Sequence, residues 1–244
     1  MEYDSNGNLI FEGECFDGIK NGKIKEYNNG KLKFEGFCLN DKKTGKGTEY
    51  YENGNIKNEG EYLNGYLNGK GIEYYDNGYI KYEGEYLNGK RHGKGKEYDN
   101  NNSYINNDMK FGLVNLDIKA INSSEKIKLD EADLGKSYNK LIYEGDFLEG
   151  KRSGNGTEYY DNGNIKFMGD YFNGERNGKG LEFYADGQME YEGEYLDGKR
   201  FGKGKEYYEN GNIKYDGEYL NGFRQGKGKE YDIEGNLIFE GDYS

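Results

Sequence analysis

The chain has 244 residues, a formal net charge of −12, 16% aromatic residues and one histidine. The acidic balance argues against general nucleic-acid binding, because phosphates attract clustered lysine and arginine rather than carboxylates. No apolar run approaches the roughly 20 residues of a membrane-spanning helix, and no signal peptide is evident, so we expect a cytoplasmic protein, either free or associated with membranes or the cytoskeleton.

A repeat of 24 residues organises the sequence. The segment YEGEYLDGKRFGKGKEYYENGNIK, from Tyr191 to Lys214, is copied almost letter for letter from Tyr215 to Ile238. We number positions 1 to 24 from Tyr191. The other six copies, of which the first is one residue short, start at Phe11, Phe34, Asn58, Tyr82, Tyr143 and Phe167. Self-similarity at a fixed period is typical of repeat proteins, in which each unit packs on its neighbours.

The copies divide the chain into three parts. Residues 1–98 hold a leading half repeat and four copies, residues 99–142 are unrelated to the repeat, and residues 143–244 hold four copies and a trailing half repeat. Within the insert, residues 110–121 alternate weakly like a strand and residues 124–134 are typical of a short helix. The insert replaces a hairpin turn, so the sheet can continue beneath it. A mobile loop, a cap on the sheet and a partner-specific element remain alternatives for it.

Two turns per repeat predict a β-hairpin array. The Asn210-Gly211 pair is typical of a two-residue hairpin turn in which both residues have positive φ. This hinge predicts the pairs Gly202–Tyr219, Lys203–Glu218, Gly204–Gly217, Lys205–Asp216, Glu206–Tyr215, Tyr207–Lys214 and Tyr208–Ile213. A second turn at residues 197–200 predicts the pairs Tyr191–Glu206, Gly193–Gly204, Tyr195–Gly202 and Leu196–Phe201.

The expected fold is all-β. It is an elongated, single-layer antiparallel meander of about seventeen strands, formed from hairpin repeats, with a non-repeat insert in the middle. One face carries aromatic rings lying beside glycines, with the Tyr at position 5 opposite the Gly at position 12, and the other carries opposite charges that face each other across strands. Nothing in the repeats predicts a helix or a second layer.

The motif Tyr-x-Gly-x-Tyr-x-x-Gly-x-x-x-Gly-x-Gly, which starts at Tyr191, resembles the MORN (membrane occupation and recognition nexus) repeat. The resemblance covers roughly residues 11–98 and 143–243. Position 5 holds Tyr, Phe or Cys where the family usually has Trp, and Ile24 and Asp41 replace glycines of the motif. The resemblance implies an elongated hairpin array used for scaffolding, targeting or self-association, and lipid binding has been attributed to the family.

Two functional hypotheses follow. The first is a non-enzymatic scaffold that binds protein partners through the curved aromatic and glycine surface, or forms a homodimer through terminal edge strands such as residues 236–243. The candidate residues for this partner surface are Tyr143, Phe147, Tyr171, Tyr191, Tyr195, Tyr215 and Tyr219. The second is a membrane-apposed adaptor that contacts anionic lipid headgroups through basic turns. The candidate residues for these headgroup contacts are Lys90, Arg91, Lys151, Arg152, Lys199 and Arg200.

The remaining reactive residues favour no catalytic, cofactor-binding or metal site. His92 occupies turn position 11, which varies freely between copies. Cys15 and Cys38 stand at position 5 of successive copies, roughly 9 to 10 Å apart, which exceeds disulfide reach, so we predict free thiols. Gly135-Lys136-Ser137 lacks the earlier glycine of a phosphate loop, and residues 99–110 lack the glycine and closing glutamate of a calcium loop.

Position 16 holds glutamate in every copy, on the tyrosine side of the sheet. The favoured interpretation is a carboxylate that accepts hydrogen bonds from tyrosine hydroxyls or turn groups, and the alternative is a row that binds cations or a basic partner. The eight residues are Glu26, Glu49, Glu73, Glu97, Glu158, Glu182, Glu206 and Glu230.

Overall fold

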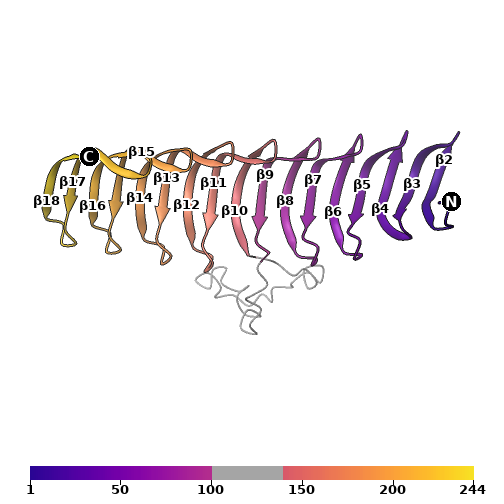
Figure 1. Cartoon of the computed structure of the whole chain (residues 1–244), viewed down its shortest axis with the longest axis horizontal. Coiled ribbons are helices and arrows are strands. Elements are labelled where there is room, and N and C mark those ends of the chain that lie inside the picture. The colour runs from indigo at the N-terminus through magenta and orange to yellow at the C-terminus, as the bar shows by residue number, and fades with distance from the viewer. Residues whose placement is uncertain (101–139) are drawn as a thin grey trace, which may run out of the picture.

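The computed structural model describes residues 1–100 and 140–244, which form one open antiparallel sheet (Figure 1). The expected all-β meander is confirmed, and the described residues form eighteen strands and no helix. The strands are β1 (Glu2–Tyr3), β2 (Leu9–Phe16), β3 (Ile19–Asn28), β4 (Lys31–Leu39), β5 (Lys42–Tyr50), β6 (Ile56–Leu63), β7 (Tyr66–Tyr74), β8 (Ile80–Leu87), β9 (Lys90–Tyr98), β10 (Leu141–Leu148), β11 (Lys151–Tyr159), β12 (Ile165–Phe172), β13 (Glu175–Phe183), β14 (Met189–Leu196), β15 (Lys199–Tyr207), β16 (Ile213–Leu220), β17 (Phe223–Tyr231) and β18 (Leu237–Tyr243).

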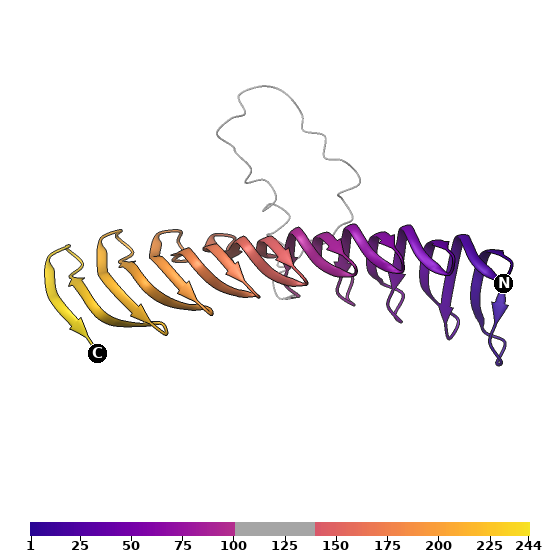
Figure 2. The same ribbon diagram turned by 90° about the horizontal axis from the view of Figure 1, so that it is seen from above.

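Each strand pairs with the next strand in the chain, so the sheet grows in one direction into a long array (Figure 2). The pairing continues across the insert: β9 pairs with β10, with Glu97 opposite Tyr143 and Gly95 opposite Gly145. The Asp99 amide donates to the Lys140 carbonyl at 3.0 Å, as the Tyr208 amide does to Asn212 in the regular copy. The predicted strand at 110–121 and helix at 124–134 lie outside the described residues.

The two turns of each repeat differ in length from the sequence prediction. At Asn210-Gly211 only the glycine has positive φ, at 86°, and its amide donates to the Tyr208 carbonyl. This is a three-residue loop, a type I turn closed by a left-handed glycine. The two-residue turn with positive φ at both residues is instead Asp197-Gly198, at 49° and 78°. The first copy, one residue short, has a two-residue turn at both ends because Asn29 and Gly30 also have positive φ.

The register is correct in the middle of each strand and shifted near the turns. All the pairs predicted from Gly202–Tyr219 to Glu206–Tyr215 are confirmed, but Tyr207 faces Ile213 because the loop is one residue longer than expected. In the β14–β15 hairpin, Tyr191–Glu206 and Gly193–Gly204 are confirmed, whereas Tyr195 faces Arg200 and Leu196 faces Lys199. A bulge beside Gly193 absorbs the difference, because the tight turn at residues 197–198 leaves extra residues on β15.

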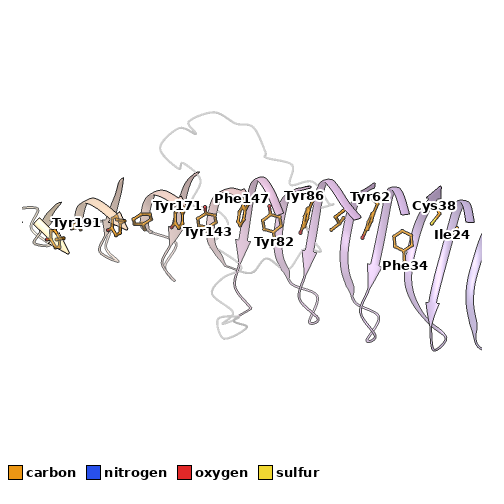
Figure 3. Close-up of a cluster of buried hydrophobic side chains, with 14 of the residues drawn as sticks. Ile24, Phe34, Cys38, Tyr62, Tyr82, Tyr86, Tyr143, Phe147, Tyr171 and Tyr191 are labelled. Atoms are coloured by element: carbon orange, nitrogen blue, oxygen red, sulfur yellow. The ribbon is translucent and has the colours of Figure 1, made fainter. Parts of the chain in front are cut away.

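The core is a single line of rings on one face of the sheet (Figure 3). From the fourth copy onward, each ring at position 1 contacts the position 5 rings of its own and the next copy edge to face, with centroids 5.1 to 5.6 Å apart. The line crosses the insert through Tyr82 and Phe147, which are 5.1 Å apart. Asn58, at position 1 of the third copy, interrupts it on the N-terminal side. Edge-to-face packing gives each pair about 0.5 to 1.5 kcal/mol beyond the burial of its area.

The rings reach full burial because glycines beneath them leave room. Tyr191 lies over Gly204, and a Cβ added at Gly204 would lie 2.5 Å from Cζ and 2.6 Å from Cε2 of Tyr191. No real side chain accepts such contacts, so the ring fills the space of the missing Cβ. Rings do lie beside glycines, but the ring concerned is that of position 1 over Gly204, whereas the expected partner Gly202 at position 12 lies next to Glu194.

Both long edges of the array are tied from copy to copy. At the turn edge, the Gly198 amide donates to the Arg176 carbonyl of the preceding copy at 3.0 Å. At the loop edge, Asn210 and Asn212 each donate a side-chain hydrogen bond to the Ile233 carbonyl of the next copy, both at 2.9 Å. These contacts connect nearest neighbours only, as expected of a linear repeat array.

Candidate binding surfaces

The seven rings predicted to form the partner surface are core residues. Tyr143, Tyr191 and Tyr215 are fully buried, and Phe147, Tyr171, Tyr195 and Tyr219 are 3 to 4% exposed. Rings in a one-layer sheet are buried this far only if something covers them. A partner approaching this face therefore meets the covering side chains rather than the rings.

The cover is a ladder of arginine and glutamate that the sequence analysis missed. The arginine at position 10 lies over the ring at position 1, and in Arg176 the guanidinium carbon is 4.0 Å from the Phe167 centroid. Arg176 also bridges Glu158 at 2.9 Å and Glu182 at 2.5 Å, which are position 16 residues of adjacent copies. The alternation runs through Glu73, Arg91, Glu97, Arg152, Glu158, Arg176, Glu182, Arg200, Glu206, Arg224 and Glu230.

The favoured interpretation of the glutamate row is confirmed in part and extended. Tyr171 donates to Glu158 at 2.5 Å and Tyr219 donates to Glu206 at 2.8 Å, as the tyrosine-hydroxyl interpretation predicts. Burial alone would raise the pKa of Glu158, but the hydrogen bonds from Arg176 and Tyr171 outweigh it and hold that pKa below its ordinary value. The glutamates in the ladder are thus satisfied by groups of this chain, and this use of their oxygens opposes the alternative of a cation-binding row.

The six residues proposed to contact lipid headgroups separate into two kinds. Arg91, Arg152 and Arg200 are folded onto rings and paired within the ladder, with side chains 17 to 25% exposed. The lysines point outward: Lys90 pairs with Glu149 at 2.5 Å, with both side chains 58% exposed, and Lys151 donates to Asn173 at 2.6 Å. Lys199 is also exposed. The charge that a turn offers to an anionic surface is therefore a single lysine rather than a Lys-Arg pair.

The opposite face of the sheet carries a groove along the glycine line. Side chains at positions 2, 4, 13 and 15 point away from the rings because neighbours alternate along a strand, and the glycines at positions 3 and 14 form the floor between them. The groove occupies about 830 Å³ from β5 to β10, about 630 Å³ from β11 to β16 and about 410 Å³ from β16 to β18. It follows the long axis of the array.

The walls of the groove carry both signs of charge. Lys94 pairs with Asp146 at 2.7 Å and Lys229 with Glu240 at 3.2 Å, which confirms the expected cross-strand pairing of opposite charges. One stretch is apolar on both strands: Met168 and Leu181 face each other, whereas every other copy has an acidic residue at position 2, opposite lysine in four copies, threonine in two and isoleucine in one. Met168 is 42% exposed and lines the groove with Leu181. The groove thus has an apolar stretch between charged ones.

A second surface follows the turn edge on the same side of the sheet as the groove. Position 6, next to the two-residue turn, is apolar in all eight copies and 40 to 71% exposed. We call this row the turn-side rail. Its residues are Phe16, Leu39, Leu63, Leu87, Leu148, Phe172, Leu196 and Leu220.

The remaining candidates from the sequence stand apart from these surfaces. His92 lies on β9 opposite Glu85. Both cysteines are free thiols, with Cys15 exposed and Cys38 buried in the ring line. Among residues 1–100 and 140–244, no group of three or more His, Cys, Asp or Glu side chains is placed to hold a metal ion.

The described segments also contain no helix that is long and apolar enough to cross a membrane.

Comparison with known families adds a sequence match to this geometry. The MORN repeat model matches residues 59–78, 82–104, 143–165, 167–189, 191–213 and 215–236, and the model of a MORN repeat variant matches residues 43–64. These matches cover more than half of the chain. No curated protein matches it.

Proposed function

Because the chain belongs to the MORN repeat family, we propose that it is a non-enzymatic scaffold that binds a protein partner along its groove. The observation that carries the proposal is the groove itself, which continues over the copies on both sides of the insert. A concave, partly apolar surface with a few polar groups is the usual setting for binding.

The chemistry of the groove favours a protein segment as its occupant. The apolar stretch at Met168 and Leu181 offers an anchor for an apolar side chain, and charged walls of both signs lie on either side of it. Lysine walls alone would select an anionic ligand, but Asp170, Glu192 and Glu194 line the same groove. A peptide carrying one or two apolar residues flanked by mixed charges meets these demands.

The ring face supports binding less well. Its rings are buried and its ladder charges are paired with each other, so a partner there would have to separate ion pairs before making contacts of its own. Breaking a largely buried ion pair by removing one partner costs about 3 to 5 kcal/mol, which opposes binding by that route. A partner that binds at Met168 in the groove separates no ion pair.

The alternative of a membrane adaptor has less support. Arg152 and Arg200 each pair with glutamates of the ladder, so they are not available to a headgroup without losing those contacts. Lys151 and Lys199 remain exposed at the turn edge. Co-sedimentation with vesicles containing and lacking anionic lipid tests this alternative, and pelleting that depends on anionic lipid and is lost in a Lys151→Ala/Lys199→Ala variant would favour it over the groove.

The groove proposal is tested by affinity capture with matched variants. Met168→Glu/Leu181→Lys removes the apolar stretch and installs the acidic–lysine pair that Glu192 and Lys205 form in the next copy, so the sheet keeps a pairing that it already tolerates. We expect at least one protein captured by the wild-type chain to be depleted about tenfold or more with this variant. The control is Ile233→Lys, which adds a charge at an exposed apolar residue outside the groove.

Equal capture by the wild-type chain and the groove variant would contradict the proposal. Loss of the same protein with Ile233→Lys would also contradict it, because that residue lies in a loop between β17 and β18 and not in the groove.

A further inference from the structure

We propose that the turn-side rail is an interface with a second copy of this chain, so that two arrays associate side by side. The rail is the most regular exposed apolar feature of the described residues: every copy contributes one large apolar side chain, and none is less than 40% exposed. The rail residues are interspersed with position 9 residues, which are apolar in three copies and charged in five, yet soluble monomers rarely leave this much apolar surface uncovered.

The rail's area is sufficient for a stable dimer. Its eight residues keep about half of their surface exposed, and a large apolar residue has roughly 200 Å² of it, so covering the rail removes roughly 800 Å² per chain. Two chains together lose roughly 1,600 Å², which is the size of a standard stable interface. Tyr66 and Phe223, which are exposed at position 9 beside the rail, add to this area.

The spacing of the rail selects its occupant. Successive position 6 side chains are two strands apart, or roughly 9.6 Å. An α-helix places a residue on the same face every seven residues, or roughly 10.5 Å, and so falls out of step by about one ångström per copy. A second array has the same spacing by construction, so its side chains meet the rail in the same phase in every copy.

The rim of the rail is complementary to itself. Lys42 and Lys199 at position 9 lie beside the turn residues Asp41 and Asp197, so a single turn displays both signs of charge. Two identical rims approaching each other can therefore place lysine opposite aspartate, and a two-fold interface requires such a self-complementary surface.

The test measures the mass of the full chain in solution by sedimentation equilibrium over a range of concentrations. We expect the wild-type chain to reach twice its monomer mass of 28.0 kDa. Phe172→Glu/Leu196→Glu places two charges in the rail and should weaken the dimer about tenfold or more. Circular dichroism should stay unchanged because both side chains are exposed in the monomer, and the unfolding midpoint should match that of the wild-type chain at concentrations where the wild-type chain is monomeric.

The control separates the rail from the end of the sheet. Ile233→Glu/Ile238→Glu carries the same charge change at two residues that are 51% and 60% exposed, in the last loop and on β18. This variant should dimerise like the wild-type chain. If it loses the dimer while the rail variant keeps it, the chains associate through the terminal strand and the rail proposal is overturned.

Two further outcomes would also overturn it. One is a wild-type chain that stays monomeric at every concentration. The other is a monomer that pellets with neutral phosphatidylcholine vesicles and loses this binding in the rail variant, which assigns the rail to a lipid surface. If the glutamate variant fails to fold, the milder Phe172→Gln/Leu196→Gln variant is measured in the same way and should again weaken the dimer.

Discussion

The contact between Tyr191 and Gly204 gives the sharpest test of how the sheet is held together. In Gly204→Ala, the added Cβ would lie 2.5 to 2.6 Å from the ring carbons Cζ and Cε2 of Tyr191. The ring cannot move aside easily, because Tyr195 and Tyr219 pack against it edge to face and Arg200 lies over it at 4.3 Å. Overpacking of this kind costs about 1 to 3 kcal/mol, and the confined ring places the cost near about 3 kcal/mol.

The same substitution should cost much less when the ring is absent. In the Tyr191→Ala background the three atoms nearest to the new Cβ are gone. The contacts that remain resemble those at Gly71, whose copy has Asn58 in place of the ring and where an added Cβ would lie 3.2 Å from two ring carbons of Tyr86, so a smaller cost of about 1 kcal/mol is expected. Tyr191→Ala alone should cost about 3 to 5 kcal/mol as a buried aromatic residue. The coupling between the two sites is therefore expected to be about 2 kcal/mol.

Urea denaturation followed by circular dichroism measures all four corners of this cycle. Lys205→Ala is the control, because Lys205 neighbours Gly204 on the opposite face and should cost less than about 0.5 kcal/mol. A Gly204→Ala cost below about 0.5 kcal/mol, or an equal cost in both backgrounds, would refute the reasoning that the ring occupies the space of the missing Cβ.

Three further predictions concern the ladder and the insert. Arg176→Ala removes a cation that bridges two glutamates and covers a ring, so it should lower the free energy of unfolding by about 3 to 5 kcal/mol in urea titrations, and Arg176→Lys should recover only part of this loss. Equal stability of the wild-type chain and the alanine variant would contradict the ladder. Burial would raise the pKa of Glu206, but the hydrogen bonds from Arg224 and Tyr219 hold that pKa below the ordinary 4.5. The contribution of Glu206 to the free energy of unfolding is therefore complete above pH 4.5 and is lost as the pH falls below it. Glu206→Gln should make the free energy of unfolding depend less on pH in this acid range, and an unchanged pH dependence would contradict the assignment. Replacing residues 100–139 with Glu-Asn-Gly, the loop of residues 209–211, should keep the β9–β10 register. It should raise stability by about 2 kcal/mol, because the chain segment that must be closed between β9 and β10 shortens from about 40 residues to about three. Loss of the sheet signal in circular dichroism would contradict the continuity of the array.

The sequence predicted the features that depend on local pattern. Alternation around the Asn210-Gly211 hinge fixed the central register, and it indicated that rings lie beside glycines, although the ring that covers glycine is Tyr191 rather than the expected position 5 ring. The turn types were exchanged because Asn-Gly suits both a two-residue turn and a three-residue loop. The pair Asp197-Gly198 forms the tighter turn, and the choice depends on where the flanking strands pair.

The surface chemistry depended on contacts that cross copies. Arg200 was taken for a basic turn residue because it follows Lys199 next to glycine, and nothing within one copy shows that it folds back over Tyr191 and reaches Glu182 of the previous copy. One signal was present: position 10 holds lysine or arginine in every copy except the third, where Leu67 stands, and position 16 is always glutamate. A cation kept at position 10 and a carboxylate kept at position 16 indicate that the two side chains form an ion pair.

The burial of the rings was missed for a related reason. The sequence analysis assigned the aromatic and glycine face to partner binding, so Tyr191 and Tyr215 were interpreted as an accessible surface. The arginine cover makes them the core and leaves the groove and the turn-side rail as the surfaces open to partners.

The most direct measurement of the central claim uses the methionine methyl signals of the full chain. Met168 lies in the groove, whereas Met1 and Met189 do not line it. On titration with a protein captured by the wild-type chain, the Met168 methyl resonance should shift or broaden while those of Met1 and Met189 stay in place. Saturating partner that leaves the Met168 signal unchanged would contradict binding along the groove.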